Sequence, residues 1–296
     1  MTRTDSYPLV SIILPTYNRS GLILETIESV IGQDHRNWEL LVVDDRSTDD
    51  TEMRVRSFDD DRVRYHKTSS RLGVTGTRNE GLRLSKGELI AFIDSDDLWD
   101  PSKLEKQVAA LQRYPGAGFS LTGGYNFRKA REPFEFFYKL KEGERYDKLL
   151  VPFFKSEVAA TTPSLLFRRS CLPVTGMFDE SKSFADVDFI LRLARNFKGV
   201  ILYEPLLFRR VHESNISNAH WEKGYDEGLT LIESHRHLLP GSIVSNALFK
   251  LHINRGEKYL RFGHRSKALH DFLKAWRRKP FSIVAVKKIV KCVLAK

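Results

Sequence analysis

The segment Gly87–Pro101, with the sequence GELIAFIDSDDLWDP, organises the chain. Its apolar run over residues 89–93 is short and lies between a glycine and polar residues, which is typical of a buried parallel strand. Three carboxylates, Asp94, Asp96 and Asp97, follow where that strand must end. Carboxylates this close raise one another's pKa unless a cation compensates their charge. Because Mg²⁺ and Mn²⁺ bridge carboxylates to phosphates, the segment predicts a metal and phosphate site at the carboxyl end of the strand, where open α/β sheets bind ligands.

The acidic cluster also has a structural interpretation. Asp-rich segments after strands are often solvated turns or helix N-caps, and Asp100–Pro101 is suited to the start of a helix. A short motif on its own has many chance matches. The choice between the two interpretations therefore depends on the rest of the chain.

The bulk composition is that of a soluble globular protein, with 296 residues, 41% of them apolar and 29% charged. No run approaches the ~20 apolar residues of a membrane span. The first residues lack the apolar core of a signal peptide, so we expect a cytoplasmic protein. The two cysteines, Cys171 and Cys292, indicate neither a disulfide framework nor a structural zinc site.

The net charge of +10 is unevenly distributed. Basic proteins favour phosphate-bearing partners, nucleic acid or anionic membranes. From Lys274 onward every charged residue is basic, and a tail of this kind predicts peripheral contact with an anionic membrane surface, at the inner face of the cytoplasmic membrane. The sequence contains no recognised nucleic-acid-binding module, so we expect no specific nucleic-acid partner.

Strands and helices alternate along the first part of the chain. We expect strands at 9–14, 38–43, 63–66 and 89–93, with helices between them, and this order predicts a doubly wound, mostly parallel sheet. Polar groups follow three of the strands, at Pro15–Arg19, Asp44–Asp45 and Asp94–Asp97. In a parallel sheet these ends share one edge and can meet one ligand. Neither a GxGxxG nor a GxxxxGK[ST] motif is present, which disfavours dinucleotide and Walker-type sites.

Four segments, in this order and at this spacing, resemble the family 2 glycosyltransferases of the GT-A fold. They are VSIILPTYNR from residue 10, LLVVDDRSTDDT from residue 40, RLGVTGTRNEGLRLSKGELIAFIDSDDLWDP from residue 71 and FADVDFILRLA from residue 184. The resemblance covers about residues 9–217. It implies an α/β fold of GT-A type, with a doubly wound, mostly parallel (mixed) sheet flanked by helices.

The resemblance also implies a domain organisation. Residues 1–220 would form the catalytic domain, with a nucleotide-binding half at about 1–118 and an acceptor half at about 119–220. Residues 221–296 would form a C-terminal helical extension.

Nucleotide-binding and metal-binding roles follow from matching positions in these segments. Asp44 matches an aspartate that accepts a hydrogen bond from uracil, and Asp94 matches a residue that faces ribose and metal. Asp96 and His212 would hold Mn²⁺ or Mg²⁺, which offsets the charge developing on the departing diphosphate. The residues that the resemblance assigns to nucleotide binding are Pro15, Thr16, Tyr17, Arg19, Asp44, Arg78, Asn79, Asp94 and Ser95.

Asp186 is the expected catalytic base. It would deprotonate the acceptor hydroxyl, a step that typically contributes 10²–10⁴-fold. The structural alternative is a helix N-terminal aspartate that interacts with the helix dipole, and Asp188 is expected to have such a structural role. Ala185 stands where the family usually has glutamate.

The acceptor side is expected from residue 119 onward. Arg168 ends an expected return strand over 160–167, and Asp179 belongs to a G-x-F-D-E-like loop. Together with Ala185, these positions match the acceptor pocket of the family. The aromatic run Phe134–Tyr138 is either a platform or flap for the acceptor, or a core or loop anchor.

The resemblance implies an inverting, metal-dependent transfer of a sugar from a UDP-sugar to a saccharide or lipid-linked acceptor, in cell-surface polysaccharide or glycolipid synthesis. The alternative is a non-catalytic nucleotide-sugar-binding or scaffold protein of the same fold. Ala185 is the one departure from the motifs that favours this alternative.

The C-terminal extension is expected to be helical. Helices over 225–239, 243–262 and 266–278 include one hairpin that resembles a tetratricopeptide repeat. Small residues at Gly263, Ala268 and Ala275 would let two helices approach. Residues 281–294 have the pattern of a basic amphipathic helix, which suits an anionic leaflet or packing against the core.

Overall fold

The computed structural model describes residues 7–128, 132–137, 143–159, 161–182, 185–211 and 221–294. The chain divides into two compact units, residues 1–150 with 158–212, and residues 151–157 with 213–296. Helix α5 (Leu150–Phe154), which lies in the region expected to form the acceptor half, therefore contributes most of its length to the second unit.

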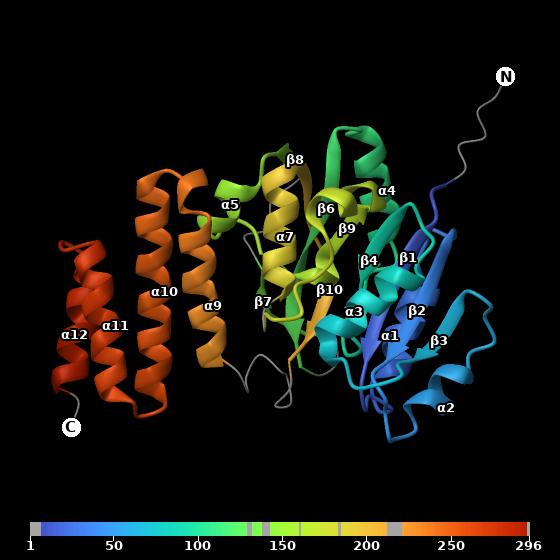
Figure 1. The fold of residues 1–296 in the computed structure, drawn as a ribbon, viewed down its shortest axis with the longest axis horizontal. Helices are drawn as coiled ribbons and strands as arrows, with labels where there is room; N and C mark the ends of the chain where they lie inside the picture. Colours follow the sequence, from blue (N-terminus) through green and yellow to red (C-terminus); the bar gives the residue numbers. More distant parts are fainter. Residues whose placement is uncertain are drawn as a thin grey trace. The chain divides into compact units, whose positions relative to one another are not determined.

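The first unit is built on one mixed, ten-stranded sheet within the described residues (Figure 1). Its main path has the order β3-β2-β1-β4-β9-β6-β10-β5, while β7 pairs with β6 and β8 pairs with β10. The strands are β1 (Val10–Thr16), β2 (Trp38–Asp44), β3 (Val63–Lys67), β4 (Leu89–Phe92), β5 (Leu98–Trp99), β6 (Ala117–Phe127), β7 (Pro133–Phe136), β8 (Glu144–Asp147), β9 (Leu165–Arg168) and β10 (Lys198–Arg210).

Strand direction brings several strand ends to one edge of this sheet. β1, β2, β3 and β4 are parallel, with Thr16 opposite Asp44 and Ile13 opposite Phe92. β9 is antiparallel to both β4 and β6, and β10 is parallel to β6. The carboxyl ends of β6 and β10 therefore lie at the same edge as those of β1, β2 and β4. We call this the carboxyl edge.

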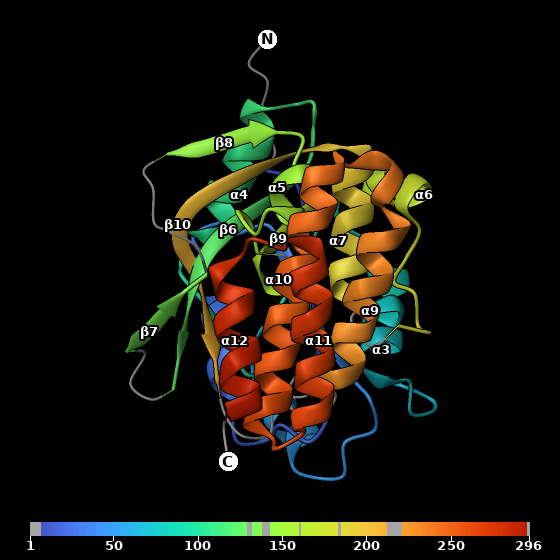
Figure 2. The same ribbon diagram turned by 90° about the vertical axis from the view of Figure 1, so that its left-hand side faces the viewer.

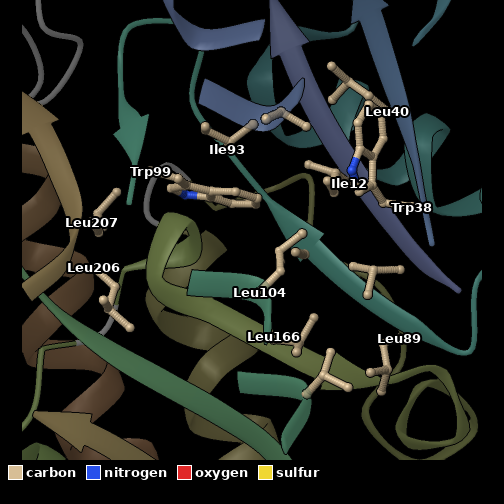
Figure 3. Packing of buried hydrophobic residues seen from close by; sticks show 14 of the residues in the cluster. Ile12, Trp38, Leu40, Leu89, Ile93, Trp99, Leu104, Leu166, Leu206 and Leu207 are labelled. Carbon is tan, nitrogen blue, oxygen red and sulfur yellow. The ribbon is translucent and has the colours of Figure 1, made fainter. Parts of the chain in front are cut away.

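Helices cover both faces of the sheet, as the doubly wound pattern predicts. On one face, α1 (Ile23–Ile31), α2 (Thr51–Arg56) and α4 (Lys103–Arg113) pack onto strand side chains that alternate along β1 and β2. Figure 3 shows part of this core, in which Ile12, Trp38 and Trp99 are enclosed by leucines and isoleucines. Burial of these apolar side chains is the main source of the unit's stability.

The other face carries α3 (Gly73–Leu84) and α7 (Ala185–Asn196). Gly81 lets α3 approach β1 closely, because a Cβ at this position would lie 2.4 Å from Ile13. Phe189 of α7 packs against Phe167 and Phe178, and Phe178 in turn contacts Phe92 of β4. This aromatic packing holds the start of α7 against the sheet. The short α6 (Leu172–Thr175) precedes the segment that carries Phe178.

The expected strands and helices of the first hundred residues are confirmed, with shifts of one or two residues at their ends. The expected return strand over 160–167 is shorter, since β9 begins at Leu165 after a 3₁₀ turn over Thr162–Ser164. Proline at the start of that turn removes a donor that a strand would need.

The second unit is helical, with α9 (Trp221–Ser234), α10 (Gly241–Arg261), α11 (Arg265–Arg278) and α12 (Ile283–Leu294), seen together in Figure 2. α10 and α11 form the expected hairpin. The expected small residues Ala268 and Ala275 are fully buried in the core of this unit. Gly256 also allows close approach, since a Cβ there would lie 2.5 Å from the Phe272 ring. Gly263 instead forms the turn between the helices with φ +79°. Among the described residues, no helix is long and apolar enough to cross a membrane.

Candidate active site

The loops that follow β1 and β2 are joined to each other at the carboxyl edge. The backbone N–H of Asn18 donates to Ser47 Oγ at 2.9 Å, and its side-chain Oδ1 accepts from Thr48 N at 2.9 Å. The backbone N–H of Arg19 donates to Thr51 Oγ1 at 2.9 Å. Asn18 takes a φ of +50°, a value that asparagine tolerates better than most residues. These bonds fix the walls of a site at the ends of the two strands.

Asp44, the expected partner of uracil, is fully buried. Its Oδ1 accepts from the N–H and the hydroxyl of Ser47, and its Oδ2 accepts from the Tyr65 hydroxyl at 2.5 Å. Burial, together with the Asp44 carboxylate, raises the pKa of Tyr65 above its ordinary value. The structure therefore shows Asp44 holding the turn after β2, which is a role that the sequence pattern did not indicate.

Tyr17 and Arg71 form a stacked pair beside these loops. The Arg71 guanidinium lies 3.4 Å from the centre of the Tyr17 ring, and Tyr17 is exposed. Arg71 is fixed by Asp45, whose carbonyl accepts from its Nη1 at 3.1 Å. The Asp45 carboxylate also accepts from the backbone N–H groups of Leu72 and Gly73 at the start of α3. Arg71 was not singled out from the sequence, because only the fold brings it onto Tyr17.

Arg78 connects α3 to the acidic segment after β4. Its Nη2 donates to Asp94 Oδ1 at 2.8 Å, and its side chain is almost fully buried. Its Nε is buried without a hydrogen-bond partner in the described part of the chain. Thr16 Oγ1, at the end of β1, is likewise buried without a described partner. Buried polar atoms of this kind are uncommon in native proteins and favour a bound ligand or water at this edge.

Asp186 lies in the first turn of α7, where Val187 N–H donates to its Oδ1 at 2.9 Å. Burial raises the pKa of its carboxyl above the ordinary value of 3.8, the nearby Arg78 guanidinium opposes this shift, and Asp94 adds to it. Because the charges of Arg78 and Asp94 act on Asp186, the three side chains lie near one another, although Asp94 follows β4 and the other two belong to α3 and α7. A carboxylate with a raised pKa is suited to accept a proton.

The acidic segment turns back toward the end of β10. Asp97 Oδ1 accepts from the backbone N–H of Arg210 at 3.0 Å, and the Asp96 carbonyl accepts from Arg210 Nε at 3.1 Å. Arg210 also pairs with Glu25 of α1 at 2.8 Å. Ser95, between the aspartates, is buried. Arg210 therefore ties the end of β10 to the acidic segment.

The electrostatic surroundings of Asp97 indicate whether the acidic segment suits a divalent cation. Burial, followed by the charges of Asp96 and Asp94, raises the pKa of Asp97 well above its ordinary value, and its Oδ2 has no hydrogen-bond partner among the described residues. The described residues contain no cluster of three His, Cys, Asp or Glu side chains that could enclose a metal. A cation here would rest on one or two carboxylates and on phosphates of the ligand, which is how Mg²⁺ is often bound. The donor set fits that mode.

Four expected site residues have other surroundings. Asn79 is buried and connects α3 to the loop before α7. Its side-chain Nδ2 donates to the Phe178 carbonyl and to Glu180, and its Oδ1 accepts from the Phe178 N–H. Arg168 pairs in register with Leu89, at the opposite end of β4 from Asp94, and donates to the carbonyls of Leu111 and Ala117. The structure does not bring Arg168 to the carboxyl edge.

Asp179 and Ala185 flank the loop that leads into α7. Asp179 accepts from the Ser181 N–H and hydroxyl in an exposed turn, and these bonds hold its pKa below the ordinary value. Ala185 is the buried first residue of α7. Asp188 is held by ion pairs with Lys182 and Arg192. His212 lies outside the described residues.

A sheet of this order, with an Asp-x-Asp segment and a partly buried carboxylate at its carboxyl edge, defines a GT-A-type fold. The solved structure of S. aureus TarS 1-349 in complex with UDP has this fold, with a TM-score of 0.68 at 20% identity over 96% of this chain and 88% of that one. Mannosyltransferase PcManGT from Pyrobaculum calidifontis, solved with GDP-Man and Mn2+, has a TM-score of 0.62 at 20% identity over 98% and 80%.

Residues 11–170 match glycosyl transferase family 2, and the chain belongs to this family. It is 31% identical to the uncharacterized glycosyltransferase RT0329 of Rickettsia typhi, over 74% of this chain and 69% of the relative. It is 45% identical over 107 residues to the UDP-Glc:alpha-D-GlcNAc-diphosphoundecaprenol beta-1,3-glucosyltransferase WfgD of Escherichia coli. That match covers 36% of this chain and 42% of WfgD, so the chain spans less than half the length of this relative.

Proposed function

We propose that this chain transfers a sugar from a nucleoside diphosphate donor, in the first place a UDP-sugar, to a hydroxyl of a saccharide or lipid-linked acceptor, with inversion at the anomeric carbon. The observation that carries the proposal is the grouping of Asp94, Arg78 and Asp186 at the carboxyl edge. It provides a contact for the donor and a proton acceptor in one site. Membership of family 2 supports the reaction class.

Asp186 acts as the base in this proposal. Its carboxylate takes the proton of the acceptor hydroxyl, and the hydroxyl oxygen attacks the anomeric carbon from the face opposite the diphosphate. The bond between that carbon and the diphosphate oxygen breaks, and the nucleoside diphosphate leaves with the bonding electrons. The raised pKa of Asp186 supports this role, because a base works best when its pKa lies nearer the working pH.

A Mn²⁺ or Mg²⁺ ion would be held by Asp96 together with His212, and it would neutralise charge on the diphosphate. The support is the acidic segment itself, in which burial and then the charges of Asp96 and Asp94 raise the pKa of Asp97. PcManGT, which was solved with Mn2+ beside its GDP-Man, is a structural neighbour in line with this assignment.

Nucleotide binding is proposed for the loop walls of the carboxyl edge. The exposed Tyr17–Arg71 stack offers a flat surface for the base. Pro15 and Thr16 end β1 directly before Tyr17, and Arg19 lies on the loop that follows. Asp44, which is fully buried, contributes to nucleotide binding by holding the Ser47 turn. Ser95 and Asp94 complete the donor side. The UDP complex of TarS supports the choice of nucleotide.

The acceptor is proposed to bind near the ends of β6 and β10. Strand β7 pairs with the end of β6 and leaves Phe134 and Phe136 exposed, which favours a platform over a core anchor. Asp179, on the loop before α7, and Ala185, the first residue of α7, complete this side. WfgD, named for a diphosphoundecaprenol substrate, supports a lipid-linked acceptor. We place the reaction at the inner face of the cytoplasmic membrane, in cell-surface polysaccharide or glycolipid synthesis.

The test is release of UDP from a panel of UDP-sugars, with Mn²⁺ and a saccharide or lipid-linked acceptor. We expect Asp186→Asn to lower transfer by 10²–10⁴-fold while UDP still binds. Asp96→Asn should lower transfer and weaken its dependence on Mn²⁺. Asp61→Asn, which changes an exposed carboxylate in the turn before β3, is the matched control and should keep full activity.

The competing function is a nucleotide-sugar-binding or scaffold protein without catalysis, which Ala185 favours. Binding of UDP-sugars without turnover by the wild type, across the donor and acceptor panel, would support this competitor. Transfer by Asp186→Asn at the wild-type rate would remove the base assignment.

A further inference from the structure

Helix α12 of the second unit leaves an apolar stripe exposed. Successive residues of a helix are 100° apart, so its side chains divide into three faces. Ala285 and Cys292 are buried against the hairpin of α10 and α11. A second face is solvent-exposed, with Ile283 70% and Leu294 72% exposed. This stripe consists of Ile283, Val286, Val290, Val293 and Leu294.

The third face of α12 is basic. It carries Lys287, Lys288 and Lys291, which adjoin the apolar stripe on one side and the hairpin on the other. Aspartate and glutamate are absent from the sequence after Asp271. The helix therefore has an apolar stripe flanked by lysines, the pattern of helices that lie in the interface of a membrane.

A basic pocket lies beside the lysine face. Its volume is about 540 Å³, and it is lined by Glu257, Leu260, Arg261, Gly263, Arg265, Lys288 and Lys291. The lining of the pocket therefore has four basic side chains and one carboxylate. Glu257 pairs with Lys288, and Arg265 donates to the carbonyl of Cys292 at 2.9 Å, which caps the end of α12. Within the described ranges, Arg261 and Lys291 have no carboxylate partner, so the pocket retains positive charge for an anion.

We propose that α12 docks this protein on an anionic lipid bilayer. The apolar stripe inserts at the boundary between head groups and acyl chains, and the basic pocket receives a lipid phosphate. Phe281, which precedes α12 by two residues and is 98% exposed, adds an aromatic contact. A second copy of the chain is a poorer occupant, because it would bring two lysine faces together. Docking concerns binding alone and does not depend on catalysis by Asp186.

The experiment is flotation of the full chain with vesicles of phosphatidylcholine, alone or mixed with phosphatidylglycerol. We expect recovery with the anionic vesicles, reduced by salt, and none with the neutral ones. Lys287→Gln with Lys291→Gln should lower the partition coefficient by roughly 25-fold, at roughly fivefold per lysine. Val286→Ser with Val290→Ser should lower it at least about tenfold, because both valines lose buried apolar area.

Matched controls come from an exposed apolar residue and an exposed lysine outside α12. Met53→Ser on α2 and Lys223→Gln on α9 should float like the wild type. All the substituted side chains are exposed, so each of these variants should have the melting temperature of the wild type. Asp186→Asn should float normally, which separates a failure of docking from a failure of the proposed catalysis.

Three results would overturn docking. The first is equal recovery with neutral and anionic vesicles, or recovery that survives both double substitutions. The second is saturable binding of inorganic pyrophosphate without recruitment to vesicles, which would make the pocket a site for free anions. The third is a dimer in solution that Val286→Ser with Val290→Ser converts to monomers, again without recruitment, which would assign the stripe to self-association.

Discussion

Arg78 Nη2 donates to Asp94 Oδ1 over 2.8 Å and thereby joins the middle of α3 to the carboxyl end of β4. The guanidinium is buried, whereas the carboxylate is partly exposed. The same cation opposes the rise in the pKa of Asp186. One side chain thus links the donor side of the candidate site to its base, and this link can be tested.

Replacing Arg78 by glutamine removes the positive charge that opposes protonation of Asp186. We expect the pKa of Asp186 to rise further and transfer at neutral pH to fall, with the acid limb of the pH–rate profile moved upward. The lost charge-assisted bond should lower the free energy of unfolding by about 1.5 kcal/mol. Rates across pH and urea unfolding measure the two effects. An unchanged profile would show that Arg78 does not act on the base.

The pH dependence of the wild type follows from Asp186. Burial raises its pKa above 3.8, and a base is active only when ionised. Activity should therefore rise with pH through the raised pKa and then level off, and it should be lost on acidification earlier than for an ordinary carboxylate. The same shift makes this group's contribution to stability fall as pH rises from 3.8 through the raised value. Single-turnover rates at saturating donor, measured across pH, report the profile. A flat profile would contradict the role of Asp186 as the base.

Asn79→Ala should act on stability rather than on nucleotide contacts. The substitution removes the bonds to the Phe178 backbone and to Glu180, and it leaves buried groups unpaired. We expect a loss of about 2–3 kcal/mol in urea unfolding, with UDP affinity of the folded protein unchanged. Asn196→Ala, at the exposed end of α7, is the control and should cost less than about 0.5 kcal/mol. A large loss of UDP affinity at full stability would instead favour a nucleotide contact.

Tyr17→Ala should weaken UDP binding by about five- to tenfold, because the stacked surface for the base is lost. Calorimetric titration with UDP measures the change. Arg71→Ala should have a similar effect, and the double variant should lose less than the sum of the two, since the residues stack on each other. Tyr7→Ala, an exposed tyrosine before the opposite end of β1, is the control. Equal UDP affinities for the wild type, the two single variants of the stack and the double variant would exclude this stack from the base site.

Asp271 and Asp226 offer a matched pair in the helical unit, because both bind Arg255. Asp271 is 1% exposed and also accepts from His252, whereas the Asp226 side chain is 67% exposed. We expect Asp271→Asn to cost about 3 kcal/mol and Asp226→Asn less than about 1 kcal/mol in urea unfolding followed by circular dichroism. Equal costs would show that burial does not strengthen the pair.

Acid should weaken the helical unit through the same residue. Burial acts to raise the pKa of Asp271, but the hydrogen bonds from His252 and Arg255 outweigh it and lower that pKa. Its stabilising contribution is present above the unfolded value of 3.8 and is lost as pH falls through the lower folded value. The Asp271→Asn variant should lack this part of the acid dependence.

The sequence alone determined the alternation of strands and helices, the acidic segment after β4 and the helical C-terminal region. These follow from local periodicity and from polar residues at strand ends, which short windows of sequence contain. The common edge of the residues after β1, β2 and β4 was also predictable, because the carboxyl ends of parallel strands share an edge, whereas the place of Asp186 followed from the resemblance to the family. Only the tertiary structure decided which polar side chains form hydrogen bonds that stabilise the fold. The carboxylate of Asp44 accepts hydrogen bonds from Ser47 and Tyr65. The amide of Asn79 bonds to the backbone of Phe178, almost a hundred residues away in sequence. Arg168 donates to the backbone carbonyl of Leu111 at the opposite edge of the sheet. The tertiary structure also decided which of the apolar side chains of α12 remain exposed. Such partners are distant in sequence, and a hydrogen bond or a buried contact exists only once folding has brought them within a few ångströms.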